Sequence, residues 1–258
     1  MSVHDKESEE KKMKKIYDKD EMNFALIWIG IYVVLFSVAE NLSASIGIEK
    51  AITAPLSVAL TIIMIVWLKK YHLEEKYGLC KYRGTAKQYL YFIPFILLAT
   101  TNLWCGARLN YSIMETLLYV VSMMCVGFLE EMIFRGFLFT GMCKSNVKIA
   151  ILVSSLTFGA GHIVNILNGR EVFETLVQVC YATAVGFAFT IMFYKGKSIW
   201  PCIITHSVIN SLSGVANRDA DNFTTKIAAC VFLCVVSLAY GWYLIKCLEN
   251  RDESCSES

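Results

Sequence analysis

The 258-residue sequence contains few charged residues, few prolines and few histidines. Charged residues make up 18% of the chain and hydrophobic residues 56%, whereas a soluble domain usually has about 25% charged and about 45–50% apolar residues. A chain this poor in charge is not an ordinary soluble domain. Its apolar residues lie in long runs, and a helical membrane span requires roughly 20 of them in succession. The composition therefore indicates an integral membrane protein.

Several chemical signatures are also missing. The ten cysteines include no C-x-x-C pair, and most of them lie inside apolar runs, where free cysteine behaves as a small hydrophobic residue. This pattern supports neither a thiolate zinc site nor a disulfide framework. The local helical zinc signature H-E-x-x-H is absent, and no Ser-His-Asp set is apparent.

What the sequence does have is a series of apolar runs separated by short charged segments. The runs are residues 24–47, 51–68, 89–107, 113–129, 147–167, 176–194, 198–215 and 227–247. Runs this long and this uniformly apolar favour helices over the alternating strands of a barrel. We therefore predict an all-α fold, a polytopic transmembrane helix bundle of about eight spans. The fourth helix is expected to continue past its charged end toward Thr140.

The charged segments at the two ends set the expected domain boundaries. We expect residues 1–21 to be a charged cytoplasmic tail, residues 22–248 to be a single transmembrane domain with its core motifs at 130–210, and residues 249–258 to be a short cytoplasmic tail. No soluble domain or internal repeat is evident.

Individual residues in the apolar runs carry further expectations. Pro55 and Pro201 fall near the first turns of their helices, where proline is tolerated, whereas Pro94 lies inside the third run and should kink it. Glu40 and Asn41 lie toward the outer end of the first run. They have no evident partner and are expected to serve packing or the membrane interface.

The distribution of Lys and Arg predicts the orientation in the membrane. With the amino terminus in the cytoplasm and eight spans, 19 of the 24 Lys and Arg residues fall on the cytoplasmic side and five on the other. Cytoplasmic loops of membrane proteins carry such an excess. We therefore expect a multi-pass protein with both termini cytoplasmic, in the cell membrane if the source is bacterial.

The first polar motif is the sequence E-E-M-I-F-R in the fourth run. On a helix, Glu131 and Arg135 are four residues apart and can form an ion pair, while Glu130 is rotated by about 100°. One carboxylate can then be neutralised while Glu130 faces the bundle interior, where it would suit a general base. The alternative is a charged helix end that contacts lipid headgroups.

The second motif is F-G-A-G-H in the fifth run. Phe158 and His162 share one helix face, and Gly159 and Gly161 remove bulk, so that another helix or a substrate backbone can approach closely. A histidine in a membrane helix can also serve only as a hydrogen-bonding contact between helices. Both interpretations remain open at this point.

The third motif is H-S-V-I-N in the seventh run. Its four-residue spacing places His206 and Asn210 one above the other on one helix face. Such a pair can donate two hydrogen bonds to one oxygen, as an oxyanion site requires. The alternative is polar contact between helices. The remaining histidines, His4 and His72, lie in charged segments.

Taken together, E-E-x-x-x-R, F-x-x-x-H and H-x-x-x-N, in this order on three spans, resemble the CPBP family. That family contains the CAAX prenyl protease 2 (Rce1-type) enzymes and the Abi-type, bacteriocin-immunity-associated proteins. The resemblance covers about Glu130 to Asn210, roughly a third of the chain, and each signature position matches. The ordered triplet is specific, although each motif alone is weak.

The resemblance implies an intramembrane endopeptidase that cleaves peptide bonds near the cytoplasmic side of the membrane. Glu130 would be the base and would hold the attacking water together with His162. His206 and Asn210 would stabilise the tetrahedral oxyanion. The supporting residues would be Glu131, Arg135 and Phe158. The substrate would be a peptide or protein, including membrane-anchored ones, and no nucleic acid is expected as a partner.

The resemblance leaves the metal question open, because members of the family are commonly labelled metalloproteases. We favour a metal-free mechanism without a cofactor. The alternative is a zinc site in which Glu130, His162 and His206 are the ligands and one position is left for water. Two other functions also remain: a non-catalytic immunity or scaffold protein, and a proton-coupled carrier that uses the same residues as a relay.

Overall fold

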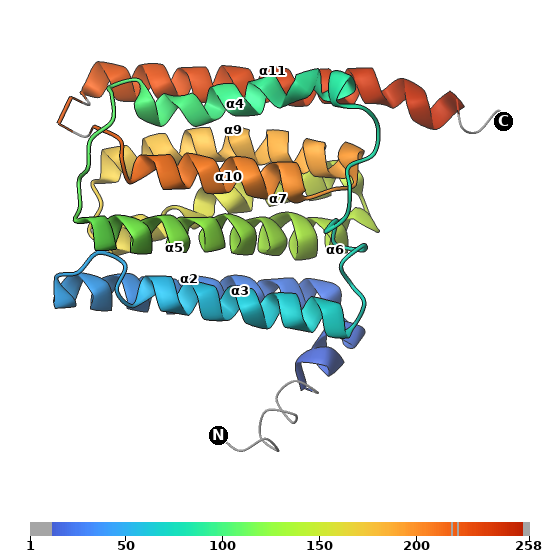
Figure 1. Ribbon diagram of the computed structural model, residues 1–258. Helices are drawn as coiled ribbons and strands as arrows, with labels where there is room; N and C mark the ends of the chain where they lie inside the picture. Colours follow the sequence, from blue (N-terminus) through green and yellow to red (C-terminus); the bar gives the residue numbers. More distant parts are fainter. Residues whose placement is uncertain (1–11, 218, 221, 255–258) are drawn as a thin grey trace.

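The chain folds into an all-α, polytopic membrane bundle (Figure 1). The computed structural model describes residues 12–217, 219, 220 and 222–254. The α-helices are α2 (Glu21–Ile46), α3 (Thr53–Lys70), α4 (Ile93–Thr100), α5 (Ile113–Glu131), α6 (Thr140–Cys143), α7 (Val147–Gly161), α8 (Val164–Leu167), α9 (Val172–Gly196), α10 (Trp200–Ser213) and α11 (Phe223–Ser254). Two 3-10 helices, η1 (Ala86–Phe92) and η2 (Thr101–Leu103), flank α4, and a π-helix, η3 (Met132–Phe139), joins α5 to α6. The described residues contain no β-strand.

Among the residues that the structure describes, six segments are long and apolar enough to cross a membrane. They are Glu21–Ile46, Thr53–Lys70, Ile113–Cys143, Val147–Leu167, Val172–Gly196 and Phe223–Cys247. The predicted count of eight is therefore not confirmed, although the other two apolar runs are also helical. One of them is divided among η1, α4 and η2, and α10 has only 14 residues, or about 21 Å at 1.5 Å per residue. The fourth helix does continue past its charged end, as expected, through η3 into α6.

Proline and left-handed residues explain why the third apolar run is broken. Leu90, Tyr91 and Phe92 have φ values of 50°, 51° and 58°, which end η1 because L-residues cannot continue a right-handed helix there. Pro94 then lies in the first turn of α4, where its missing N–H costs nothing. The expectation that Pro94 kinks a continuous helix was wrong, because the helix begins at Ile93 instead.

Polar residues at the helix ends define where several spans begin. The Asp20 carboxylate accepts hydrogen bonds from the backbone N–H groups of Met22 and Asn23 at the start of α2. Ser112 and Glu115 form a capping box at the start of α5. Pro55 and Pro201 lie in the first turns of α3 and α10, as predicted. The caps at Asp20 and Ser112 provide hydrogen-bond acceptors for backbone N–H groups, which lipid could not do.

The helices stack in layers with their long axes nearly parallel (Figure 1). Helices α2 and α3 lie side by side in one outer layer, next to α5, and α4 and α11 lie in the opposite outer layer. Between them, α9 packs against α7 and α11, and α10 packs against α5. The ends of α5, α7 and α10 that carry the three motifs therefore lie inside the bundle.

An aromatic cluster attaches the amino-terminal segment to the bundle. Residues 12–19 are helical, and the Tyr17 ring packs edge-on against Phe24 and Trp67, with centroids 5.3 and 5.2 Å away. The Tyr77 hydroxyl donates a hydrogen bond to the Tyr17 hydroxyl. Part of the expected charged tail is thus folded onto the bundle, while residues 1–11 lie outside the described part of the chain.

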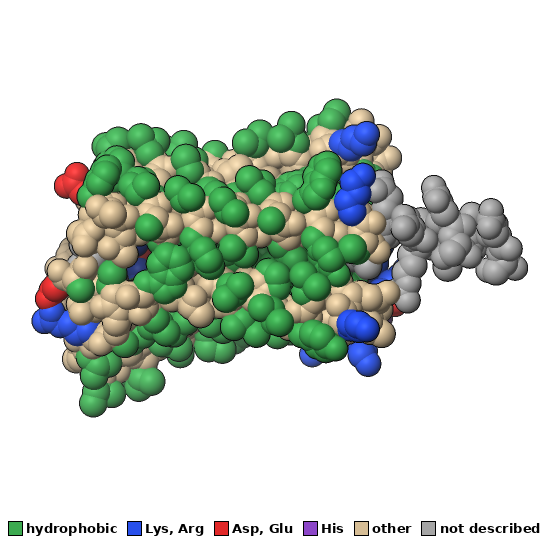
Figure 2. Space-filling model, turned by 90° about the horizontal axis from the view of Figure 1, so that it is seen from above, with side chains coloured by type: hydrophobic (Ala, Val, Ile, Leu, Met, Phe, Trp, Pro, Cys, Tyr) green, Lys and Arg blue, Asp and Glu red, His purple; other side chains and the backbone are tan. Residues whose placement is uncertain are grey.

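The surface has the pattern of a membrane protein (Figure 2). Hydrophobic side chains cover the middle of the molecule, and Lys and Arg side chains gather mainly at one end. Helix α2 begins and helix α11 ends at this same end (Figure 1). Many large apolar side chains of the helices are exposed, where lipid would surround them, for example Val34, Val66 and Val235. The chain is an integral, multi-pass membrane protein.

Candidate functional site

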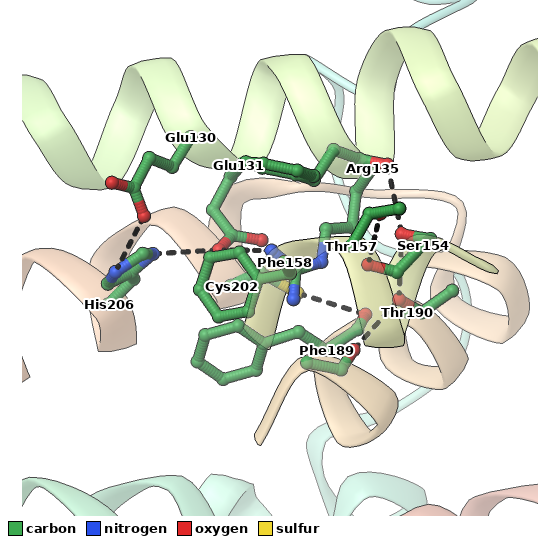
Figure 3. A network of polar contacts seen from close by, with 12 residues as sticks. Glu130, Glu131, Arg135, Ser154, Thr157, Phe158, Phe189, Thr190, Cys202 and His206 are labelled. Atoms are coloured by element: carbon green, nitrogen blue, oxygen red, sulfur yellow. Dashed lines mark hydrogen bonds and ion pairs between the residues drawn. The ribbon is translucent and has the colours of Figure 1, made fainter. Parts of the chain in front are cut away.

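Residues of all three motifs lie together around one buried polar network (Figure 3). Glu130 and Glu131 end α5, Arg135 lies in η3, and His206 lies on α10. In Figure 3 the His206 ring lies between the two glutamates and contacts both. Side chains 75 residues apart in the sequence are thus in direct hydrogen-bond contact.

Glu131 is the fully buried carboxylate of the pair. Its Oε1 accepts a hydrogen bond from Arg135 at 3.0 Å and contacts His206 Nδ1 at 2.8 Å. The side chains of Glu131 and Arg135 are both 0% exposed. The sequence-based prediction of this ion pair is confirmed. It did not include the contact with His206, which fixes the orientation of the imidazole ring and directs Nε2 away from Glu131.

Glu130 is the more accessible carboxylate, with 14% of its side chain exposed. Its Oε1 accepts a hydrogen bond of 2.6 Å from the hydroxyl of Tyr32 on α2. Its Oε2 lies 3.6 Å from His206 Nε2, slightly beyond hydrogen-bond distance. One oxygen of Glu130 is therefore engaged by tyrosine and the other faces an imidazole nitrogen.

Tyr32 is a site residue that the sequence analysis missed. It lies in the middle of the first apolar run, 98 residues before Glu130. The available signal was a tyrosine far from both ends of a span, since Tyr in membrane helices usually gathers at the interfaces. A hydroxyl at that depth needs a partner, but the sequence does not say which one.

His162 lies directly after the last residue of α7. Its Nδ1 is 3.0 Å from the backbone carbonyl oxygen of Phe158. A carbonyl oxygen can only accept, so Nδ1 carries the proton and Nε2 of a neutral ring keeps a lone pair. His162 is thus arranged as a hydrogen-bond acceptor or a base through Nε2.

The Phe158 ring contacts Arg135 and both histidines of the site. Its ring packs edge-on against His162 and His206, with centroids 5.3 and 5.5 Å away. The Arg135 guanidinium lies over the same ring at 4.0 Å, a favourable cation–π distance. Both histidines thus pack against one apolar ring.

Asn210 lies one turn beyond His206 on α10 and is half-buried. Its backbone carbonyl accepts a hydrogen bond from Ser213 at 2.7 Å. Its side chain forms no hydrogen bond with any residue that the structure describes. The network therefore does not include the side chain of Asn210, and its role remains a prediction.

Glycines allow the helices around the network to approach closely. A Cβ atom on Gly127 would lie 2.3 Å from the hydroxyl oxygen of Ser207, next to His206, and one on Gly159 would lie 2.0 Å from that of Thr183. A Cβ on Gly186 would lie 3.1 Å from the Arg135 guanidinium. The proposed role of Gly159 in close helix contact agrees with this geometry. Gly161 has a looser environment, with Phe134 3.7 Å away.

The π-helix η3 begins immediately after Glu131, and all eight of its residues are buried. π-Helical segments are rare in proteins, and those that occur are often found at functional sites. The Ser154 hydroxyl of α7 donates to the carbonyl of Phe134 at 3.0 Å, and Thr140 donates to that of Arg135 at 3.3 Å. These side chains stabilise carbonyl groups in the widened helix. The π-helix was not predicted from the sequence.

Glu40 and Asn41 do have partners, contrary to the expectation. Both oxygens of Glu40 lie 2.7 Å from the Lys50 ammonium group. The Asn41 amide donates hydrogen bonds to the Ser37 carbonyl and to Asn168 Oδ1. The sequence could not reveal these contacts because they depend on how the loops close at the end opposite the Lys-rich one.

Imidazole and carboxylate groups of the site are donors of the kind that a zinc ion binds. Among residues 12–217, 219, 220 and 222–254, no three His, Cys, Asp or Glu side chains are grouped so that they could hold a metal ion. The alternative ligand set of Glu130, His162 and His206 is thus not assembled in this arrangement.

Comparison with known proteins places this network in a family context. Residues 112–212 match the family model "Type II CAAX prenyl endopeptidase Rce1-like". The expected resemblance is confirmed over this segment. It runs from the cap of α5 to the end of α10 and contains the predicted site residues, but not Tyr32.

A curated relative agrees with this match. The protein named "Putative membrane peptidase YdiL" of Bacillus subtilis (strain 168) is 32% identical over 96 residues. The aligned region covers 37% of this chain and 35% of the relative, so the match spans about a third of each protein. No solved structure gives a significant match.

Proposed function

We propose that the protein is an intramembrane endopeptidase of the CAAX-protease type that uses a glutamate-activated water. The observation that carries the proposal is the arrangement of Glu130, whose free oxygen faces an imidazole nitrogen at 3.6 Å in the interior of a membrane bundle. Ionisable groups at such depth are costly and are functional candidates by default. The Rce1-like match over residues 112–212 and the similarity to a named membrane peptidase support the same class.

In the proposed mechanism, Glu130 Oε2 accepts a proton from a water molecule that is also held by His162 Nε2. The resulting hydroxide attacks the carbonyl carbon of the scissile peptide bond. His206 and Asn210 stabilise the negative charge on the carbonyl oxygen. The C–N bond then breaks, and the proton held by Glu130 passes to the leaving nitrogen.

The contacts of His206 indicate which of its ring nitrogens must carry a proton for this role. Nδ1 lies 2.8 Å from the Glu131 carboxylate and donates to it. Nε2 can donate a hydrogen bond to the oxyanion only when it is also protonated, so His206 acts as an imidazolium. Arg135 in turn holds the Glu131 carboxylate in place.

Access from the cytoplasmic side is part of the proposal. We assign the Lys-rich end to the cytoplasm, with both termini there, because cytoplasmic loops are enriched in Lys and Arg. His206 lies six residues from Trp200 at this end of α10, or about 9 Å along the helix. The Glu130 carboxylate lies beside it, with Oε2 3.6 Å from His206 Nε2, so a substrate segment would have to reach this level of the bundle.

The decisive test replaces Glu130 by Gln, which preserves shape but removes the base. Quantitative membrane peptidomics of cells with the wild type and with Glu130→Gln is expected to show a set of peptide products that disappears in the variant. The exposed Glu75 provides the matched control Glu75→Gln, which should leave the products unchanged. Both variants should remain folded and in the membrane.

Other outcomes of this experiment would identify the competing functions. A carrier would lose ion-linked flux in Glu130→Gln without any change in peptide products. A non-catalytic immunity or scaffold protein would keep its biological effect. Either result would contradict the peptidase proposal.

The metal-free form of the mechanism has its own test. Purified, active protein is expected to contain no stoichiometric zinc and to keep its activity in the presence of chelators. Metal analysis and activity measurements after chelation check this. Activity that is lost on chelation and restored by zinc would require a metal mechanism instead.

A further inference from the structure

We propose that Tyr32 is a positioning residue for Glu130. Its hydroxyl fixes the Glu130 carboxylate so that Oε2 is the oxygen that takes the proton from water. This inference rests on the proposed function. Tyr32 lies on α2, outside the matched segment of residues 112–212. The candidate site would then depend on a helix from the amino-terminal part of the chain.

The chemistry of the contact defines its direction. An ionised carboxylate can only accept hydrogen bonds, so the Tyr32 hydroxyl donates to Glu130 Oε1 at 2.6 Å. A hydrogen bond to a charged acceptor is stronger than one between neutral groups. Rotation of the carboxylate about its last bond would break it. Oε2 is therefore held toward His206 Nε2, which lies 3.6 Å away.

Tyr32 packs against a neighbour on its own helix, and helix α2 is held in place by contacts on both sides of Tyr32 along the chain. The Phe36 ring, one turn along α2, lies 4.3 Å from the Tyr32 ring. Toward the Lys-rich end, Phe24 packs edge-on against Phe137 of η3 at 5.1 Å. Toward the other end, the Ser37 hydroxyl donates to Asn168 Oδ1 at 2.7 Å. These contacts fix α2 relative to η3 and the α8–α9 turn, so the hydroxyl has little freedom to leave Glu130.

The test compares Tyr32→Phe with Tyr240→Phe in the full-length protein. Tyr240 is the matched control because its hydroxyl is also buried and also donates one hydrogen bond, to the Tyr89 carbonyl at 2.9 Å. For a peptide product that depends on Glu130, Tyr32→Phe is expected to lower kcat about 10- to 100-fold, the effect of losing one hydrogen bond to a charged group. KM should stay within about twofold, since the substrate is not contacted.

A conservative replacement and a spectroscopic measurement complete the test. Incorporation of 3-fluorotyrosine at position 32 keeps the hydroxyl and should retain most of kcat. Infrared spectroscopy identifies the Glu130 carboxylate band as the one missing from Glu130→Gln. This band should shift in Tyr32→Phe and stay in place in Tyr240→Phe.

The outcomes separate the two proposals. If Tyr32→Phe keeps the wild-type kcat, or leaves the Glu130 band in place, or loses activity only in proportion to folded protein, the positioning role is wrong. If wild-type membranes contain no product that depends on Glu130, the peptidase function fails, and the infrared band then decides by itself whether Tyr32 orients the carboxylate.

Discussion

At the scale of single residues, the site consists of polar groups that stabilise one another inside an apolar bundle. Glu131 compensates the charge of Arg135, orients His206 and leaves Glu130 to face that histidine. Removing one member of such a buried pair leaves an uncompensated charge, whereas removing both can be nearly neutral. The ion pair therefore serves positioning more than stability.

Arg135→Met tests this interpretation at the Glu131–Arg135 pair. The single variant leaves the Glu131 carboxylate without its cation, and we expect it to lower the free energy of unfolding by about 3–5 kcal/mol. The double variant Glu131→Gln/Arg135→Met removes both charges of the ion pair and should recover most of that loss. Chemical unfolding in detergent micelles measures both. A double variant as unstable as the single one would contradict the interpretation.

At the scale of helices, small residues decide how closely the side chains of the candidate site approach one another. Gly127 of α5 contacts Ser207 of α10, directly beside His206 and three residues before Glu130. Any side chain at position 127 would separate the two helices that carry the imidazole and the carboxylates. The same contact explains why α5 and α10 pack so closely.

Gly127→Ala should therefore both destabilise and inactivate the protein. Its Cβ would lie 2.8 Å from the Ser207 backbone nitrogen, and overpacking of this kind typically costs about 1–3 kcal/mol. Gly30→Ala on α2 is the control, because nothing lies within 4 Å of its Cβ. Thermal unfolding in micelles and the yield of Glu130-dependent products measure the difference. Equal behaviour of the two variants would show that the close approach is unimportant.

At the scale of the whole molecule, the charge distribution gives the bundle a direction. Lys and Arg side chains gather mainly at one end (Figure 2), where helix α2 starts and helix α11 ends (Figure 1). Cys247 belongs to α11 near this end, and Cys105 lies in the loop after η2 at the other. These two cysteines can report which end faces the cytoplasm.

Cysteine labelling in intact cells tests the proposed orientation. In variants that retain only Cys105 or only Cys247, a membrane-impermeant maleimide is expected to label Cys105 directly. It should label Cys247, which is exposed, only after the membrane is permeabilised. The reverse pattern would invert the topology and place the Lys-rich end outside.

The sequence by itself determined the class of fold and part of the site. The apolar runs specify membrane helices because lipid cannot satisfy an open backbone, and the i,i+4 spacing of Glu131 and Arg135 suffices to predict their ion pair. The motif order also indicated the Rce1-like resemblance. All of these signals are local, or are read from residues in a fixed order along the chain.

Only the tertiary structure decided which distant groups touch. The bonds from Tyr32 to Glu130 and from His206 to Glu131 join residues 98 and 75 positions apart, and the partners of Glu40 and Asn41 were likewise hidden. Helical periodicity shows which residues share a face, but it does not show which neighbouring helix that face meets. That choice depends on close packing at residues such as Gly127, where the absence of one side chain lets two helices bring their polar groups together.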